Sequence, residues 1–229
     1  MYGSGKSVKG WTLPAEYYTN ILYPLQDKAI PAFKDSPFYL TGGTALSRGY
    51  YNHRYSDDLD YFVNFHPQFQ QLAQTSTQKL LQLFENKVEI DIRGEHFYRI
   101  FVADRKLKIE FINDVPSHIG TFVNHPILGR IDSKENILAN KLTAIVDRTM
   151  PKDMVDLYFL LQDGLDLKKA LINAESKAAG IAPLLVAKIF GEFDYSLLDT
   201  EIKWVKPVSG TTIKDFMNSI SLSIVKGTL

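Results

Sequence analysis

Two glycines and two aspartates, separated by a short helix-compatible segment, constrain this chain more than any other feature of its sequence. An apolar run ends at Gly42 and Gly43, and Asp58 and Asp60 follow on either side of Leu59. Alternate side chains of a strand point to the same face, so the two carboxylates should project together. Carboxylates side by side repel each other unless a cation lies between them, and Mg²⁺ (or Mn²⁺ in its place) prefers oxygen ligands. The pattern therefore predicts a strand that carries a divalent-cation site.

The paired glycines predict an anion site next to that cation site. Because they lack a Cβ atom, Gly42 and Gly43 let the backbone approach an anion closely with its amide groups. Thr44 and Ser56 carry hydroxyl groups that either bind phosphate oxygens or cap turns. Arg54 offers a planar fork to a phosphate or to an internal carboxylate. An anion site beside a divalent-cation site is what a nucleoside triphosphate (NTP) requires.

Composition excludes several other kinds of site. The 229 residues include no cysteine, so disulfides, thiolate zinc sites and cysteine nucleophiles are excluded. Lys and Arg together number 26, as do Asp and Glu, which argues against an indiscriminate polyanion binder. No apolar run approaches the length of a membrane span and no signal peptide is visible, so we expect a cytoplasmic protein without a membrane partner.

The rest of the sequence predicts a mixed α/β part followed by helices. Alternating residues predict strands at 88–92, 98–102 and 107–112, and helical periodicity begins at Ser133. We therefore expect an α+β fold with a small mixed sheet. Residues 1–130 should form the core, and residues 131–229 a helical lobe that completes the nucleotide cleft. The expected boundary lies in the segment 114–132.

The string GGTAL…HRYSDDLDYF resembles the signature of the DNA polymerase β-like nucleotidyltransferases. Within that superfamily it is similar to the AbiEii/AbiGii toxin nucleotidyltransferases, over about residues 38–160. The resemblance implies a polymerase β-like core and metal-dependent transfer of a nucleotide from an NTP to an acceptor, either tRNA or a protein. It also implies a toxin of a type IV toxin–antitoxin or phage-defence system, with a cognate antitoxin.

The resemblance further implies a third carboxylate, because two ions about 4 Å apart usually need one. The candidates are Glu89, Asp91 and Glu110, each flanked by apolar residues. Glu110 is the expected metal ligand, since a strand returning beside the Asp-x-Asp strand is the better donor. The family's third acid also comes just before the helical lobe, although it is more often Asp.

The helical half supplies a second group of charges. Lys141 and Arg148 fall two turns apart on about one face of the helix predicted at 137–148. This resembles the family's lysine motif, in which the lysine reaches the triphosphate. The next helix carries Lys152, Asp153 and Asp156, where the family commonly has R-D-x-x-D. The resemblance implies that Asp156 orients Lys141 or acts as a base, whereas Asp153 also suits the first turn of any helix.

Three conspicuous features are not expected to take part in the chemistry, and the first is interpreted as part of a flexible leader. Gly5-Lys6-Ser7 matches the end of a phosphate-binding loop, but the preceding glycine and strand of that motif are missing. His53 is expected in a turn or in packing. Asp57 should face away from its acidic neighbours, toward solvent or a cap.

Two alternative functions remain open from the sequence. The same chemistry could act on a small molecule, such as an antibiotic hydroxyl, and a pocket too narrow for RNA would favour this. The fold could also serve as a non-catalytic module that binds an NTP or a partner. Such a module would be a transferase fold that has lost its activity, and the intact Asp58, Asp60 and Lys141 argue against that loss.

Overall fold

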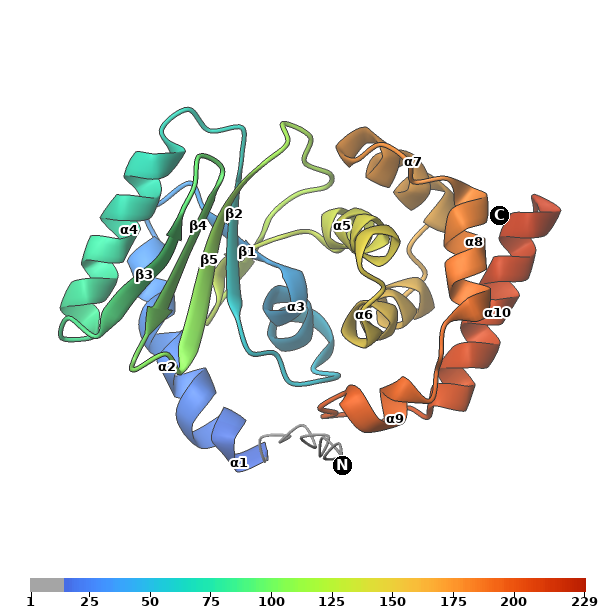
Figure 1. Ribbon diagram of the computed structural model, residues 1–229, viewed down its shortest axis with the longest axis horizontal. Helices are drawn as coiled ribbons and strands as arrows, with labels where there is room; N and C mark the ends of the chain where they lie inside the picture. Colours follow the sequence, from blue (N-terminus) through green and yellow to red (C-terminus); the bar gives the residue numbers. More distant parts are fainter. Residues whose placement is uncertain (1–14) are drawn as a thin grey trace, which may run out of the picture.

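A seven-stranded mixed sheet and a group of helices lie side by side in the computed structural model, which describes residues 15–229 (Figure 1). The Gly5-Lys6-Ser7 motif lies outside the described residues. The order across the sheet is β3-β4-β5-β2-β1-β7-β6. The strands are β1 Tyr39–Thr41, β2 Leu59–Asn64, β3 Val88–Arg93, β4 Phe97–Val102, β5 Leu107–Asp114, β6 Val123–His125 and β7 Gly129–Ile131. The predicted α+β class is confirmed.

Helices precede, interrupt and follow the sheet strands. The N-terminal segment is helical from residue 15 to 33, with a π-helical turn at Tyr18–Leu22 and a 3-10 turn at Ile30–Phe33. The helices of the first half are α1 Ala15–Tyr17, α2 Tyr23–Ala29, α3 Gly42–Thr44 with its π-helical continuation Ala45–Tyr51, and α4 Phe69–Leu83. Those of the second half are α5 Lys134–Asp147, α6 Pro151–Gln162, α7 Leu167–Lys177, α8 Pro183–Glu192, α9 Leu197–Glu201 and α10 Gly210–Lys226.

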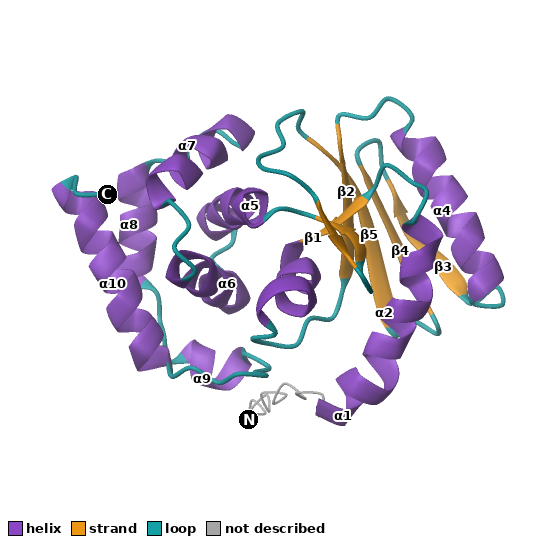
Figure 2. Ribbon diagram, turned by 180° about the vertical axis from the view of Figure 1, so that it is seen from behind, coloured by secondary structure: helices purple, strands orange, loops and turns teal. Residues whose placement is uncertain are grey.

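The two faces of the sheet have different partners. Leu59, Tyr61 and Val63 of β2 are buried, and the Tyr61 ring stacks on Phe33 with centroids 3.7 Å apart. Helices α2 and α4 lie on this side, while α3 lies between the sheet and α5 and α6 (Figures 1 and 2). The alternate β2 residues, including Asp60, therefore face α5. Burial of one strand face fixes which side chains reach the space between the sheet and the helices.

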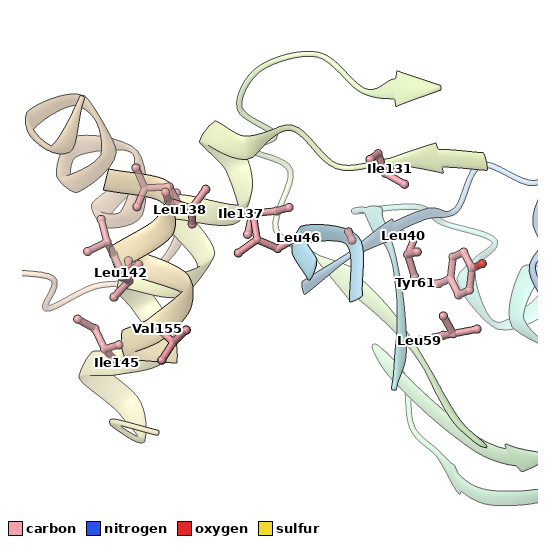
Figure 3. Close-up of a cluster of buried hydrophobic side chains, with 14 of the residues drawn as sticks. Leu40, Leu46, Leu59, Tyr61, Ile131, Ile137, Leu138, Leu142, Ile145 and Val155 are labelled. Atoms are coloured by element: carbon pink, nitrogen blue, oxygen red, sulfur yellow. The ribbon is translucent and has the colours of Figure 1, made fainter. Parts of the chain in front are cut away.

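The chain passes from sheet to helices between Ile131 and Lys134, after the short hairpin of β6 and β7. These two strands were not predicted, because runs of three residues are too short to show an alternating pattern. Ser133 caps α5, and its hydroxyl accepts a hydrogen bond from the Asn136 amide. One continuous core joins the two parts, with Leu46 and Ile137 between the sheet residues and the helical residues (Figure 3).

The C-terminal segment returns to the loop before β2. The backbone amide of Tyr55 donates to the carbonyl of Lys203 at 2.7 Å, and Arg54 forms an isolated β-bridge with Trp204. The helical part thus supports the loop that leads to the two aspartates. Within residues 15–229, every helix is too short or too polar to span a bilayer.

Candidate active site

A cavity of about 350 Å³ lies between the sheet face that carries Asp60 and helix α5. Its size suits a small-molecule ligand. Among the predicted site residues, Thr44 and Asp156 do not line it. The lining residues are Thr41, Gly42, Gly43, Arg54, Ser56, Asp57, Asp58, Asp60, Phe62, Glu110, Ile112, Asp114, Ile137, Asn140, Lys141, Thr143, Ala144, Asp147, Arg148 and Lys152.

Both glycines are required by the side chains next to them. Gly42 has a φ of +66°, in the left-handed region, and a Cβ atom there would come 2.7 Å from Asp60 Oδ2. A Cβ atom on Gly43 would come 2.6 Å from Arg54 Nη2 and 3.0 Å from Ser56 Oγ. The glycines therefore make room for a carboxylate and a guanidinium group. They also begin the helical run 42–51, whose positive N-terminal end lies at the cavity.

Asp58 and Asp60 both present carboxylates to this cavity. Asp60 lies on β2, and Asp58 directly precedes the strand, which begins at Leu59. Within residues 15–229, Asp60 has neither a hydrogen-bonding side chain nor an ion pair. Burial, together with the negative charges of Asp58 and Glu110, raises the pKa of Asp60 to about 7. A carboxylate in this setting favours a nearby cation.

Glu110 lies opposite Asp60 on the neighbouring parallel strand β5. Its Oε1 accepts hydrogen bonds from Arg99 Nε at 2.7 Å and from Lys108 Nζ at 3.2 Å. Lys108 Nζ also lies 3.0 Å from Asp58 Oδ2. Although partial burial opposes ionisation, the bonds from Arg99 and Lys108 lower the pKa of Glu110. A protein cation therefore lies between Asp58 and Glu110.

The acidic side chains fit one divalent cation better than two. In the described part of the chain, no three His, Cys, Asp or Glu side chains are placed to hold a metal ion together. Glu110, the expected third ligand, already has one oxygen bonded to two protein cations. Asp58 and Asp60 share the cavity, and the Asp60 carboxylate has no partner among the described residues. These two residues are thus the ones that would hold Mg²⁺.

A buried group of charges surrounds Asp156 on α6. Its Oδ1 lies 2.9 Å from His53 Nε2 and 2.8 Å from Arg54 Nε, and its Oδ2 lies 2.7 Å from Arg54 Nη2 and 2.6 Å from Lys141 Nζ. Although burial opposes ionisation, the charges of Arg54 and Lys141, together with the hydrogen bond to His53, hold the pKa of Asp156 well below its usual range. Four contacts from these three residues occupy its lone pairs. The contacts therefore favour the orienting role of Asp156 over that of a base.

Lys141 is buried in the same group of charges, and its Nζ also lies 2.6 Å from Asp153 Oδ1. Arg148 Nε lies 3.0 Å from Asp153 Oδ2. Arg148 is the C-cap residue of α5, and its backbone amide still donates to the carbonyl of Ala144. Lys141 and Arg148 therefore reach the same side of the helix end, where both contact Asp153 and line the cavity.

The exposed cations of the cavity are Arg148 and Lys152. The Arg148 side chain is 50% exposed despite its bond to Asp153, and Lys152 is exposed on the first turn of α6. Lys152 forms no ion pair within the described residues. By sequence alone, Lys152 stands out only as a departure from the family's arginine. Its place at the cavity wall makes it a candidate for contacting an anion.

The two hydroxyl residues next to the glycines have different surroundings. Thr44 is fully buried, and its hydroxyl is bonded to the carbonyl of Asp58 and lies 2.9 Å from Ser56 Oγ. Ser56 lines the cavity. Thr44 therefore fixes the backbone beside Asp58, while Ser56 is the hydroxyl that a phosphate could reach. Asp57 has a half-exposed side chain and pairs with Lys203 at 3.3 Å.

The other two candidate carboxylates lie at the far edge of the sheet. Glu89 pairs with Arg105 and Asp91 with Arg99, on strand β3, which β4 and β5 separate from β2. Arg99 and Lys108 were not among the residues predicted for the site. Lys108 could have been found, because a residue two positions before the expected third carboxylate lies on the same strand face.

The comparison with protein families decides the kind of protein this is. The model of one family, described as the nucleotidyl transferase AbiEii toxin of type IV toxin–antitoxin systems, matches residues 25–218. The chain belongs to the AbiEii family of nucleotidyl transferase toxins. The match extends beyond the segment 38–160 that carries the sequence resemblance, and it includes most of the helical part. Curated protein sequences gave no significant match.

Solved structures show the same fold at low sequence identity. A crystal structure from H. pylori, assigned as a nucleotidyltransferase, has a TM-score of 0.64 and 19% identity, over 94% of this chain and 97% of that one. MenT4, a nucleotidyltransferase toxin from Mycobacterium tuberculosis, has a TM-score of 0.53 and 16% identity, over 93% of this chain and 86% of that one. The structure of ANT(2″)-Ia in complex with adenylyl-2″-tobramycin has a TM-score of 0.51 and 14% sequence identity. The match covers 69% of this chain and 98% of that one. The predicted polymerase β-like fold is confirmed.

Proposed function

We propose that this AbiEii-family protein transfers a nucleotide from an NTP to an acceptor with the help of one divalent cation held by Asp58 and Asp60. The observation that carries the proposal is the pair of carboxylates in one cavity, with Asp60 free of partners within residues 15–229. Mg²⁺, for which Mn²⁺ could substitute, is the expected ion because its preferred ligands are oxygens. When bound, such an ion supplies charge stabilisation to the oxygens that attack and leave the phosphorus.

The cations of the cavity indicate where the triphosphate would lie. Arg148 and Lys152 are exposed there, and Lys141 lines the same wall from the buried group of charges. Ser56 and the first amides of the helical run at Gly43 supply hydrogen-bond donors on the opposite side. We propose that these groups hold the phosphates, while Asp156 positions Lys141 and Arg54.

The acceptor and the biological system are inferred from the family. We propose tRNA or a protein as the acceptor, and a toxin of a type IV toxin–antitoxin pair with a cognate antitoxin as the role. Incubation with each of four α-³²P-labelled NTPs, Mg²⁺ or Mn²⁺, and total RNA or cell lysate tests this directly. Label on a macromolecular band that needs both protein and divalent ion is expected. No label with any NTP would overturn the proposal, and label confined to small molecules would favour the antibiotic-type alternative.

Of the three carboxylates considered as the third acid, Glu89, Asp91 and Glu110, only Glu110 should matter for activity. Glu110→Gln removes a charge that lies opposite Asp60, so we expect transfer to fall at least about tenfold, the loss expected from about 1.4 kcal/mol of transition-state stabilisation. Glu89→Gln is the matched control, because Glu89 lies on the edge strand and pairs outside the cavity. Initial labelling rates of the two variants provide the measurement. Equal rates would contradict the placement of the reaction at β2 and β5.

Lys152→Met should weaken NTP binding. A charge-assisted contact contributes roughly 1.5–3 kcal/mol, so the Kd should rise by about one to two powers of ten. Lys168→Met is the control, since Lys168 is an exposed lysine on α7 outside the cavity. Titration of each protein with a labelled NTP measures the difference. An unchanged Kd for Lys152→Met would remove Lys152 from the triphosphate site.

A further inference from the structure

The sheet carries an alternating set of charges on the face beside the cavity. β2 and β5 run parallel, with Leu59 opposite Ile109 and Asp60 opposite Glu110. Asp58 is therefore next to Lys108, one position earlier along both strands. The ammonium lies 3.0 Å from Asp58 Oδ2 and 3.2 Å from Glu110 Oε1, so it bridges the two strands.

A second metal ion and this ammonium would compete for the same place. Mg²⁺ binds carboxylate oxygens at about 2.0–2.1 Å, so an ion shared by Asp58 and Glu110 would have to lie where Lys108 Nζ lies. Arg99 Nε, 2.7 Å from the same Glu110 oxygen, adds a further positive charge. Both side chains are partly buried, because Lys108 is 28% exposed and Arg99 is 30% exposed.

We propose that Lys108 takes the place of a second divalent cation, so that this chain works with one ion and one lysine. The inference rests on the proposed function, and it assigns new roles to two residues. Lys108 supplies a fixed positive charge next to Asp58. Glu110, with Arg99 behind it, holds the ammonium in place instead of binding an ion. Asp60 keeps its free carboxylate for the single ion.

The arrangement also explains how like charges are tolerated on adjacent strands. Asp60 and Glu110 are directly opposite each other, a pairing that is unfavourable without a nearby cation. Lys108 supplies that cation between Asp58 and Glu110, and Arg99 on β4 supplies a second cation next to Glu110. Among the described residues, removing Lys108 leaves Asp58 without an ion-pair partner and Glu110 with Arg99 alone. The freed oxygens of Asp58 and Glu110 then form a second acidic site of the kind that Mg²⁺ or Mn²⁺ binds.

Counting bound ions tests this inference without an activity assay. The electron paramagnetic resonance signal of free Mn²⁺, recorded during titration of the full chain, gives the number of bound ions. We expect one Mn²⁺ per chain for wild type and two for Lys108→Met. Lys106→Met, which removes an exposed lysine from the turn before β5, should bind one. Affinity for the first ion should rise at least about tenfold in Lys108→Met, because a nearby like charge is removed.

Each outcome of the titration bears on one claim. Two ions in wild type, no ion in wild type, or one ion in Lys108→Met would overturn the role of Lys108. Should Lys108→Met fail to fold, as shown by circular dichroism, Lys108→Gln provides the same count, and the wild-type count alone can still overturn the inference. One ion in wild type without labelling of any acceptor would leave the count intact and overturn the proposed transfer instead.

Discussion

Asp60→Asn is expected to abolish nucleotidyl transfer without weakening the fold. Asp60 faces the cavity with no protein partner in the described part of the chain, so it has no structural contact to lose. A ligand of a catalytic ion contributes several kcal/mol of charge stabilisation in the transition state. At about 1.4 kcal/mol per tenfold change in rate, the loss should be on the order of a thousandfold or more.

The same substitution gives an independent result on stability. Asparagine has nearly the shape of aspartate, and it removes one of two neighbouring negative charges that repel each other. The variant should therefore be at least as stable as wild type in urea when no divalent ion is present. Asp104→Asn, at an exposed turn position, is the matched control and should leave both activity and stability unchanged. Substantial transfer by Asp60→Asn would contradict the proposed site.

Of the aspartate-to-asparagine substitutions considered, Asp156→Asn should produce the largest loss of stability. Asp156 is fully buried and neutralises Arg54 and Lys141, while His53 lies 2.9 Å from one of its oxygens. Breaking a buried pair by removal of one partner costs about 3–5 kcal/mol, because the remaining charges are left uncompensated. That is a large part of the roughly 5–15 kcal/mol by which a typical protein is stable. Urea unfolding followed by circular dichroism measures the difference.

The difference in unfolding free energy between wild type and Asp156→Asn depends on pH, because the pKa of Asp156 is lowered in the folded protein. A group whose pKa is lower in the folded state contributes stability above its unfolded pKa, about 3.9, and loses it as the pH falls through the folded value. The gap between wild type and Asp156→Asn should therefore be full at pH 7 and should narrow below about pH 4. Asp163→Asn, in an exposed pair with Lys134, should cost at most about 1 kcal/mol. A similar cost for both variants would contradict the structural role of Asp156.

Local sequence patterns determined most of the elements and the acidic motif. The alternation at 107–112 predicted strand β5, and Ser133 marked the start of α5, because strand and helix periods are properties of neighbouring residues. The glycine pair and the Asp-x-Asp motif predicted which stretch lines the site. The resemblance that these residues carry was enough by itself to indicate the family.

Pairing between distant segments was decided only by the tertiary structure. Lys108 neutralises Asp58 because β2 and β5 run parallel in one register, and no local pattern specifies that register. Two partners of Asp156, His53 and Arg54, come from the loop before β2, about a hundred residues earlier in the chain. A buried charge must find opposite charges wherever the fold brings them, so burial selects these partners. The sequence shows which residues could carry the chemistry, and the fold decides which of them are free to do so.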